Sequence, residues 1–180
     1  MPSAREDSAN KKIMAEVILV DEQDNQIGKE EKLKAHQQAK LHRAFSILVF
    51  NEKGELLLQK RAKTKYHSPG LWTNTCCSHP GPGKDLMEEA KRRLKEEMGF
   101  ECDLKESFNF IYKADLGNLT EYEFDHVLFG NFSGNPSPNK EEADDWKWIG
   151  LQDIEKDIKE NPQSYTPWFQ IIFNKVYTRQ

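Results

Sequence analysis

Two long strand-like segments joined by a short turn restrict this chain more than any other feature of its sequence. Residues 107–114 and 120–132 are rich in aromatic and β-branched side chains, and Leu116-Gly117-Asn118 between them has the composition of a turn. Strand-like segments this close along the chain pair as antiparallel neighbours. We therefore expect a fold built on a sheet that contains this pair.

Shorter strand-like segments surround the pair. They are expected at residues 16–20, 27–30, 43–50, 55–59 and 146–149. Residues 43–50 and 55–59 flank Asn51-Glu52-Lys53-Gly54, which has the composition of a type I turn with glycine last, so we expect a hairpin there. Mostly antiparallel strands accompanied by a few helices predict the α+β class.

Three helices are indicated by capping residues and apolar faces. Asp85 suits the N-cap of the first helix, and Gly99 suits the position just after its end. A second helix is expected over residues 152–160, and a third begins at Thr166-Pro167, where a capping residue precedes a proline. The apolar residues of the first helix share one face, at Leu86, Ala90, Leu94 and Met98.

A long irregular segment, residues 61–84, separates the expected hairpin from the first helix. Loops of this length inside a compact domain are usually functional or disordered, and Trp72 and two cysteines weigh against disorder. We expect residues 1–12 to be a flexible tail and residues 13–180 to form a single domain.

The overall charge restricts the possible partners. The chain has 26 lysines and arginines against 30 aspartates and glutamates, a net charge of −4, which weighs against binding nucleic acid or anionic membrane. Its apolar segments are too short to span a bilayer, and residues 1–12 lack the apolar core of a signal peptide. Three cysteines do not make a secreted disulfide framework. We expect a soluble, cytoplasmic protein.

The strand over residues 120–126 has an unusual acidic face. Alternation places Glu121, Glu123 and Asp125 on one side, with no lysine or arginine in the strand to compensate them. One interpretation is a half-exposed strand whose acidic face lies in water. The other is a face that surrounds a cation.

Two further clusters carry reactive or charged groups. Cys77-Ser78-His79 could bind zinc, supply a nucleophile or be inert, and Cys102 alone does not complete a structural zinc site. Basic residues precede it at Lys60, Arg61, Lys63, Lys65 and, if protonated, His67. Clustered cations beside a metal-competent acidic face suggest a small phosphorylated ligand.

Several motifs together resemble a known family. Arg92-x-x-x-Glu96-Glu97-x-Gly99-Phe100 resembles the second half of the Nudix box. In their order along the chain, five strings make residues 41–177 similar to type I isopentenyl-diphosphate Δ-isomerases: Leu41–Ser46, Pro69–Pro80, Glu121-Tyr122-Glu123, Thr166-Pro167-Trp168 and the box itself. The resemblance implies a Nudix-like fold of mixed and antiparallel sheets flanked by helices. It also implies conversion of isopentenyl to dimethylallyl diphosphate.

The resemblance assigns roles to individual positions. Cys77 and Glu123 match the catalytic pair, and Tyr112 and Trp168 match the aromatic residues of the hydrocarbon pocket. The family's divalent-metal site, for Mn²⁺, Zn²⁺ or Mg²⁺, matches His36, His42, His79, Glu121 and Glu123. Glu97 matches the ligand of a Mg²⁺ that arrives with the diphosphate. Contacts to that diphosphate match Lys32, Arg61, Lys65 and Arg93. The implied enzyme is a monomer or weak dimer.

The chain also departs from the Nudix box, which keeps two rival interpretations open. Ser78, Lys84 and Arg93 stand where the full box has a glycine and two glutamates. A diphosphate hydrolase needs more carboxylates on this helix than the chain provides. A non-catalytic binding module would usually have lost the thiol and the metal ligands, which this chain keeps.

Overall fold

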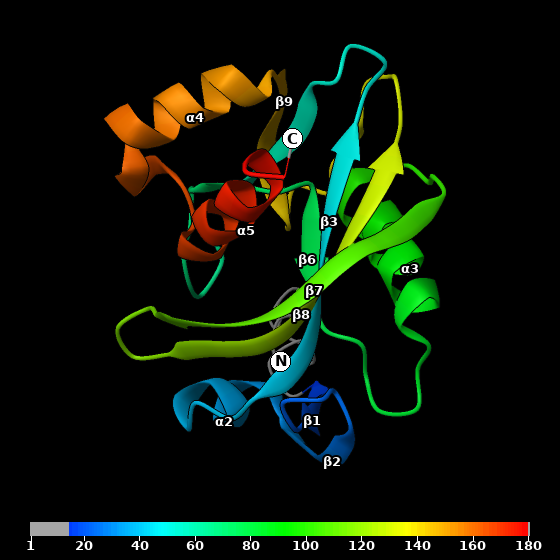
Figure 1. The fold of residues 1–180 in the computed structure, drawn as a ribbon, viewed down its shortest axis with the longest axis vertical. Coiled ribbons are helices and arrows are strands. Elements are labelled where there is room, and N and C mark those ends of the chain that lie inside the picture. The colour runs from blue at the N-terminus through cyan, green and yellow to red at the C-terminus, as the bar shows by residue number, and fades with distance from the viewer. Residues whose placement is uncertain (1–14, 180) are drawn as a thin grey trace, which may run out of the picture.

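The computed structural model describes residues 15–179, in which nine strands form one mixed sheet (Figure 1). The tail expected at residues 1–12 lies outside the described residues. The strands are β1 (Glu16–Val20), β2 (Gln26–Glu31), β3 (His42–Phe50), β4 (Leu56–Arg61), β5 (Trp72–Thr73), β6 (Cys76–Ser78), β7 (Leu104–Asp115), β8 (Thr120–Asn131) and β9 (Ala143–Ile149). The helices are α2 (Lys32–Gln37), α3 (Leu86–Met98), α4 (Leu151–Glu160) and α5 (Pro167–Tyr177), with a 3₁₀ turn at Pro162–Ser164. None of these helices is long and apolar enough to cross a membrane.

The antiparallel pair expected from the two long segments is confirmed as β7 and β8. The other edge of β8 pairs with β3 in parallel, in register from His42 beside Glu123 to Phe50 beside Asn131. A parallel pair requires a long crossover connection, and the chain between β3 and β8, which contains α3 and β7, provides it. Every other pairing between the named strands is antiparallel, so the expectation of a mostly antiparallel sheet is confirmed, with this parallel pair at its centre.

The hairpin expected from β3 and β4 is confirmed only at its turn. Gly54 donates its backbone N–H to the carbonyl of Asn51 at 2.9 Å and has a φ of 74°, a conformation that suits glycine. Beyond the single pair Phe50 and Leu56 the two strands separate, because β4 pairs along its length with β9.

The hydroxyl of Thr75 bridges the gap between the separated strands. It accepts the N–H of Val49 in β3 at 3.0 Å and donates to the carbonyl of Leu57 in β4 at 2.7 Å. Two backbone groups that lack a neighbouring strand are thereby satisfied in the buried interior. This bridge fixes the segment that carries β6 against both strands.

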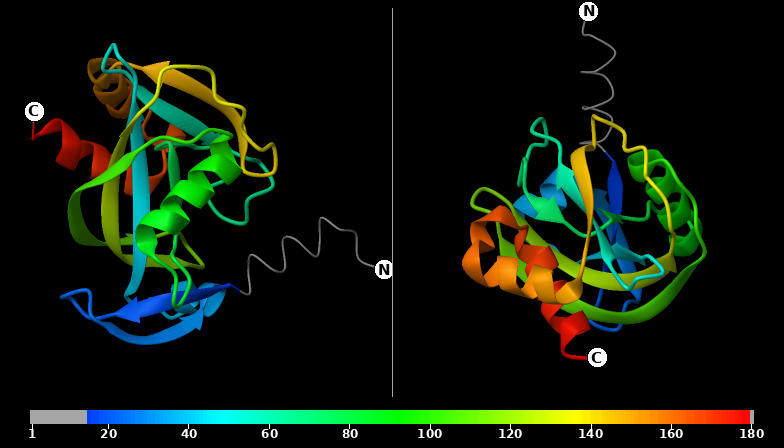
Figure 2. Two further views of the ribbon diagram at one scale, coloured as in Figure 1. Left: turned by 90° about the vertical axis from the view of Figure 1, so that its right-hand side faces the viewer. Right: turned by 90° about the horizontal axis from the view of Figure 1, so that it is seen from above.

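The central strands have a hydrophobic core on each face, one beside α5 and one beside α3. These two helices lie on opposite sides of the strands (Figure 2). Leu48 of β3 packs with Phe169 and Phe173 of α5, whereas the neighbouring Ile47 packs with Leu94 of α3. The period-two alternation of a strand divides these side chains between the cores, so β3 is apolar along most of its length.

Helix α3 begins and ends where its capping residues predict. The Asp85 carboxylate accepts the N–H of Glu88 at 2.9 Å, and Gly99 adopts a φ of 76°. A Cβ on Gly99 would lie 2.3 Å from the carbonyl oxygen of Ser137, so glycine is required both for conformation and for close approach. Both ends of the helix that carries Arg93 and Glu97 are therefore defined.

We predict that Thr75→Val destabilises the fold although valine has nearly the same shape. The substitution leaves the N–H of Val49 and the carbonyl of Leu57 without their partner, at about 1–3 kcal/mol for each buried group. Urea unfolding followed by far-UV circular dichroism measures the loss. Thr75→Ser, which keeps the hydroxyl, and Thr64→Val at an exposed position are the controls. Equal stability of Thr75→Val and Thr64→Val would contradict the bridge.

Candidate active site

Sheet register places three functional side chains in one row. His42 at the start of β3 lies beside Glu123 of β8, which in turn lies beside Tyr112 of β7. Strand β6 runs antiparallel to β3, with Ser78 opposite Phe45, so His79 follows directly toward the same end. The His79 Nε2 and the Glu123 Oε1 are 2.8 Å apart.

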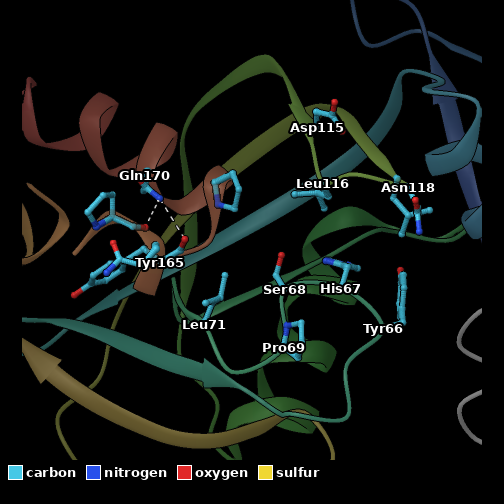
Figure 3. A pocket seen from close by; sticks show the side chains of 14 residues that line it. Tyr66, His67, Ser68, Pro69, Leu71, Asp115, Leu116, Asn118, Tyr165 and Gln170 are labelled. Atoms are coloured by element: carbon cyan, nitrogen blue, oxygen red, sulfur yellow. Dashed lines mark hydrogen bonds between the residues drawn. The ribbon is translucent and has the colours of Figure 1, made fainter.

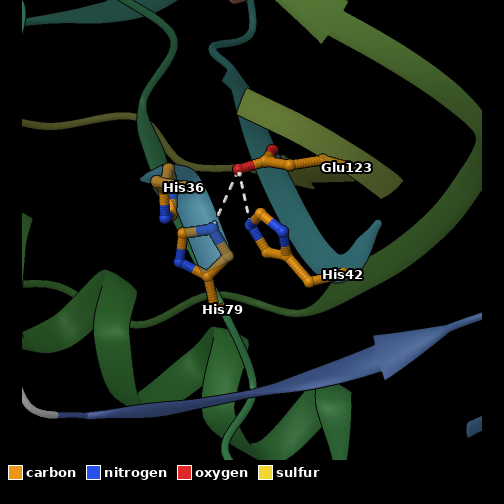
Figure 4. A group of neighbouring side chains, drawn as sticks. All are labelled: His36, His42, His79 and Glu123. Atoms are coloured by element: carbon orange, nitrogen blue, oxygen red, sulfur yellow. Dashed lines mark hydrogen bonds and ion pairs between the residues drawn. The ribbon is translucent and has the colours of Figure 1, made fainter. Parts of the chain in front are cut away.

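A fourth group, His36, reaches this row from α2. Donor atoms of His36, His42, His79 and Glu123 all lie within 4.8 Å of one another (Figure 4). The Nδ1–H of His36 donates to the carbonyl of Lys32 at 2.7 Å, and that of His42 to the carbonyl of Lys40 at 2.8 Å. Each ring therefore turns a bare Nε2 lone pair into the cluster.

These lone pairs have no partner among the described residues, although both rings are buried. Burial lowers the pKa of His36 to about 4 and that of His79 to about 3, so both imidazoles are neutral at physiological pH. Backbone carbonyls that orient neutral imidazoles are a usual support for metal ligands. Metal–nitrogen distances of about 2.1 Å separate ligand atoms by roughly 3–4 Å, which this cluster can accommodate. The donor set fits a divalent transition metal.

Glu121, expected as a further metal ligand, lies beside this four-residue group rather than within it. The hydroxyl of Tyr112 is 2.9 Å from Glu121 and 2.6 Å from Glu123. A phenol has one proton to donate, so the second contact requires a protonated carboxyl group. Burial and the neighbouring Glu123 raise the pKa of Glu121 to about 8, so Glu121 carries that proton at neutral pH while no cation neutralises the pair.

The acidic residues of β8 share one face as alternation predicts, but this face does not lie in water. Glu121, Glu123 and Asp125 are all buried. Burial and the charge of Glu123 raise the pKa of Asp125 well above its usual value, and Ser46 donates to this carboxyl group at 2.8 Å. Burial also opposes ionisation of Glu123, but the neighbouring imidazoles of His42 and His79, the second at 2.8 Å, hold the pKa of Glu123 well below the usual range. Glu123 is thus the charged member of the row.

A cavity opens in front of the row and collects most of the expected site residues. Its walls include Lys32, Arg61, Lys65, Cys77, His79, Arg93, Glu97, Tyr112, Glu121, Glu123 and Trp168. His36 and His42 do not line the cavity. The two adjacent cysteines differ, since Cys77 lines the cavity whereas Cys76 belongs to the hydrophobic core beside α3. Burial raises the pKa of the Cys77 thiol far above neutrality, so it is a proton-bearing thiol rather than a thiolate.

Four positively charged side chains line the cavity. Burial and the charges of Arg93 and Arg61 lower the pKa of Lys32, which reflects like charges held close together. Arg93 lies 2.5 Å from Glu97 across one turn of α3, and Lys65 forms an ion pair with the buried Glu142. Such a concentration of cations in a partly dry cavity suits a multiply charged anion.

Some cavity residues were not anticipated from the sequence. Gln59 shares a strand face with Arg61, and this period-two relation could have identified it. Tyr66 and His67 also line the cavity, and burial, followed by the charge of Arg61, lowers the pKa of His67 to about 2, so it is not one of the cations. Glu142 does not line the cavity but pairs with Lys65, which does, and it lies in an acidic run in which no sequence pattern distinguishes the one buried carboxylate.

Comparisons with known proteins agree on the kind of protein this is. The NUDIX domain family matches residues 40–169. An "Isopentenyl-diphosphate Delta-isomerase 2" of Aromatoleum aromaticum is 51% identical over 162 residues, which cover 89% of this chain and 86% of the relative. A protein of the same name from Photorhabdus laumondii is 54% identical over 159 residues, covering 88% of this chain and 90% of the relative.

Solved structures share the fold at low sequence identity. A protein of Deinococcus radiodurans superimposes with a TM-score of 0.76 at 16% identity, covering 90% of this chain and 99% of the other. A MutT protein of Methanosarcina mazei gives a TM-score of 0.63 at 19% identity, covering 77% of this chain and 94% of the other. The Nudix-like α+β fold expected from the motifs is therefore confirmed.

We predict that the histidine cluster binds a divalent cation. Mn²⁺ or Zn²⁺ should raise the melting temperature of the wild type, because a ligand bound only by the folded state stabilises it. His36→Ala and His42→Ala should each abolish that increase and lower the metal content measured by mass spectrometry. His126→Ala is the matched control, since His126 contacts Asp24 and Glu106 outside the cluster. An unchanged increase in either cluster variant would refute the site.

Proposed function

Because this chain belongs to the NUDIX family and to its isopentenyl-diphosphate Δ-isomerases, we propose that it interconverts isopentenyl and dimethylallyl diphosphate. The reaction moves a double bond by adding a proton at one carbon and removing another proton from the far side of the allylic system. An unactivated alkene is a very weak base, so the acid must be held against it in a cavity that excludes water.

Cys77 and Glu123 are the proposed proton-transfer groups. The observation that supports this best is that both line one cavity with Trp168 and Tyr112. The half-buried Cys77 thiol retains its proton at neutral pH because its pKa is raised, whereas Glu123 is ionised and its carboxylate accepts the Tyr112 hydroxyl. An acid and a base are therefore available around one bound alkene.

Trp168 is proposed to stabilise the tertiary cation formed by protonation. Its ring lines the cavity and is almost fully buried. An aromatic face attracts a desolvated cation by about 2 kcal/mol or more. Tyr112 adds a second aromatic wall and positions Glu123 through its hydroxyl.

The remaining polar residues are proposed to bind the diphosphate and two cations. Lys32, Arg61, Lys65 and Arg93 would contact phosphate oxygens, and Glu97 would bind the Mg²⁺ that accompanies them. His36, His42, His79 and Glu123, with Glu121 beside them, would bind Mn²⁺, Zn²⁺ or Mg²⁺. That cation would keep Glu123 oriented and tune its affinity for a proton.

A diphosphate hydrolase remains the rival activity, and α3 does not favour it. Lys84 is exposed, and Arg93 occupies a box position beside Glu97 inside the cavity. The deciding experiment incubates the protein with isopentenyl diphosphate, Mg²⁺ and Mn²⁺ and measures both acid-labile allylic product and released phosphate. We expect allylic product without phosphate, and phosphate release alone would support the hydrolase.

We predict that Cys77→Ala lowers kcat by about 10²–10⁴-fold, the usual contribution of a proton-transfer group. The fold and the metal content should persist, as checked by circular dichroism and mass spectrometry. Cys76→Ala is the control one residue away, and it should lose stability while retaining most of kcat because Cys76 packs in the core. Near-normal kcat in Cys77→Ala would contradict the assignment.

We predict that Lys65→Ala mainly raises KM for isopentenyl diphosphate, because it removes binding that the substrate and the transition state share. Steady-state kinetics of the variant at saturating Mg²⁺ measure the effect. Lys63→Ala, two residues away and exposed, is the matched control and should leave KM unchanged. The expectation for Arg61 has the same direction, but Arg61 also donates to the carbonyl of His67, so its variant is harder to interpret. Equal KM values for the Lys65 and Lys63 variants would exclude a diphosphate contact.

A further inference from the structure

A second hollow lies next to the catalytic cavity. It measures about 570 Å³, is open to solvent, and is bordered by residues 66–71, the turn between β7 and β8, residues 162–165 and the start of α5 (Figure 3). Tyr66 and His67 line both spaces, so these two side chains form a wall between them. We refer to this space as the outer hollow and to the pair as the dividing wall.

The dividing wall lies against the part of the cavity where the alkene is proposed to react. The His67 ring is 5.7 Å from the Trp168 ring, edge to face, and stacks 6.5 Å from the ring of His36. Tyr66 packs edge to face on His67 at 4.6 Å. The wall therefore contacts the proposed hydrocarbon pocket and the histidine cluster together.

Packing against Tyr66 and Trp168, rather than a side-chain hydrogen bond, holds the ring of His67. Its Nδ1 is buried and has no hydrogen-bond partner among the described residues. The ring therefore acts here through its shape. The outer hollow beyond it has a mixed lining, in which the apolar side chains of Leu71, Leu116 and Pro167 could contact a hydrocarbon and polar side chains such as Asn118 and Gln170 make up the rest.

We propose that Tyr66 and His67 determine the chain length of the substrate, by closing the hydrocarbon pocket against an outer hollow that could accommodate an alkyl extension. This inference rests on the proposed function, because it concerns the hydrocarbon of that same substrate. Removing the two rings should join the spaces without disturbing the loop. The backbone is held independently, since Gly70 donates to the carbonyl of Arg61 at 3.0 Å and Arg61 donates to that of Leu71 at 2.9 Å.

The test compares isopentenyl diphosphate with a homologue in which a butyl group replaces the methyl group. The measured quantity is kcat/KM for the homologue divided by kcat/KM for isopentenyl diphosphate, with formation of acid-labile allylic product as the assay. We expect this ratio to rise at least about tenfold in Tyr66→Ala/His67→Ala, since pocket contacts to one or more methylene groups discriminate by about 10–200-fold. Adding Asn118→Trp, which fills the outer hollow from the exposed β7–β8 turn, should remove the gain.

Each result decides the proposal. An unchanged ratio in the double variant overturns it, as does a gain that persists with Asn118→Trp or a wild type that already accepts the homologue equally well. Tyr66 is 46% exposed, so Tyr66→Ala alone should fold, and it replaces the double variant if that variant is unfolded by circular dichroism. Absence of allylic product from the wild type would instead refute the proposed function. In that case the dissociation constants of isopentenyl diphosphate and of its butyl homologue are measured instead. The ratio of these two constants in the wild type and in the variants tests the wall without turnover.

Discussion

The parallel pairing of β3 with β8 brings together segments that are far apart in the chain and sets the geometry of the whole site. Its first residue pair places His42 beside Glu123, and the antiparallel pairing of β8 with β7 extends this row to Tyr112. A shift of one residue in either register would turn Glu123 to the opposite face of the sheet. The hydrophobic cores on the two faces of the sheet oppose such a shift, because the shift would move the apolar side chains of the strand out of the core in which they pack.

The site concentrates charges that the fold would be more stable without. Burial raises the pKa values of Glu121 and Asp125 and lowers that of Lys32. The charged form of each of these three groups is therefore disfavoured in the folded protein. Two imidazole nitrogens remain without partners in the interior. Buried polar groups of this kind cost free energy unless something binds them. Their concentration around one cavity agrees with a site that is completed by cations and an anionic substrate.

Capping residues, turn residues and apolar periodicity predicted most helices and strands from the local sequence. They could not predict which strands that are distant in the sequence lie side by side. The caps of α3 and the β7–β8 turn are determined by neighbouring residues, and these predictions are confirmed. The separation of β3 from β4 depends on β9 and on the Thr75 bridge, which no local pattern in β3 reveals. Similarly, alternation predicted the shared face of Glu121 and Glu123, but their burial depends on packing of distant segments. Helix α2 was missed because its six residues are too few to show a helical period.

The ion pair between Arg93 and Glu97 restricts how the proposed substrate can enter. The two side chains lie 2.5 Å apart inside the cavity, and Glu97 also accepts a hydrogen bond from Gln59 at 2.9 Å. If Arg93 turned to a phosphate alone, Glu97 would remain as a buried carboxylate without its cation, and breaking a buried pair in this way costs about 3–5 kcal/mol. If Glu97 bound a metal ion alone, Arg93 would lose this partner and keep its contacts with Glu96 at 2.6 Å and Glu142 at 3.6 Å, while the like charges of Lys32 and Arg61 remain nearby. The proposed diphosphate, if it arrives together with Mg²⁺, would replace both partners at once. The free protein would then favour the neutralised pair, and the substrate complex would favour two new contacts. The same argument accounts for a carboxylate and an arginine at adjacent turns of α3, where a hydrolase would present a second carboxylate.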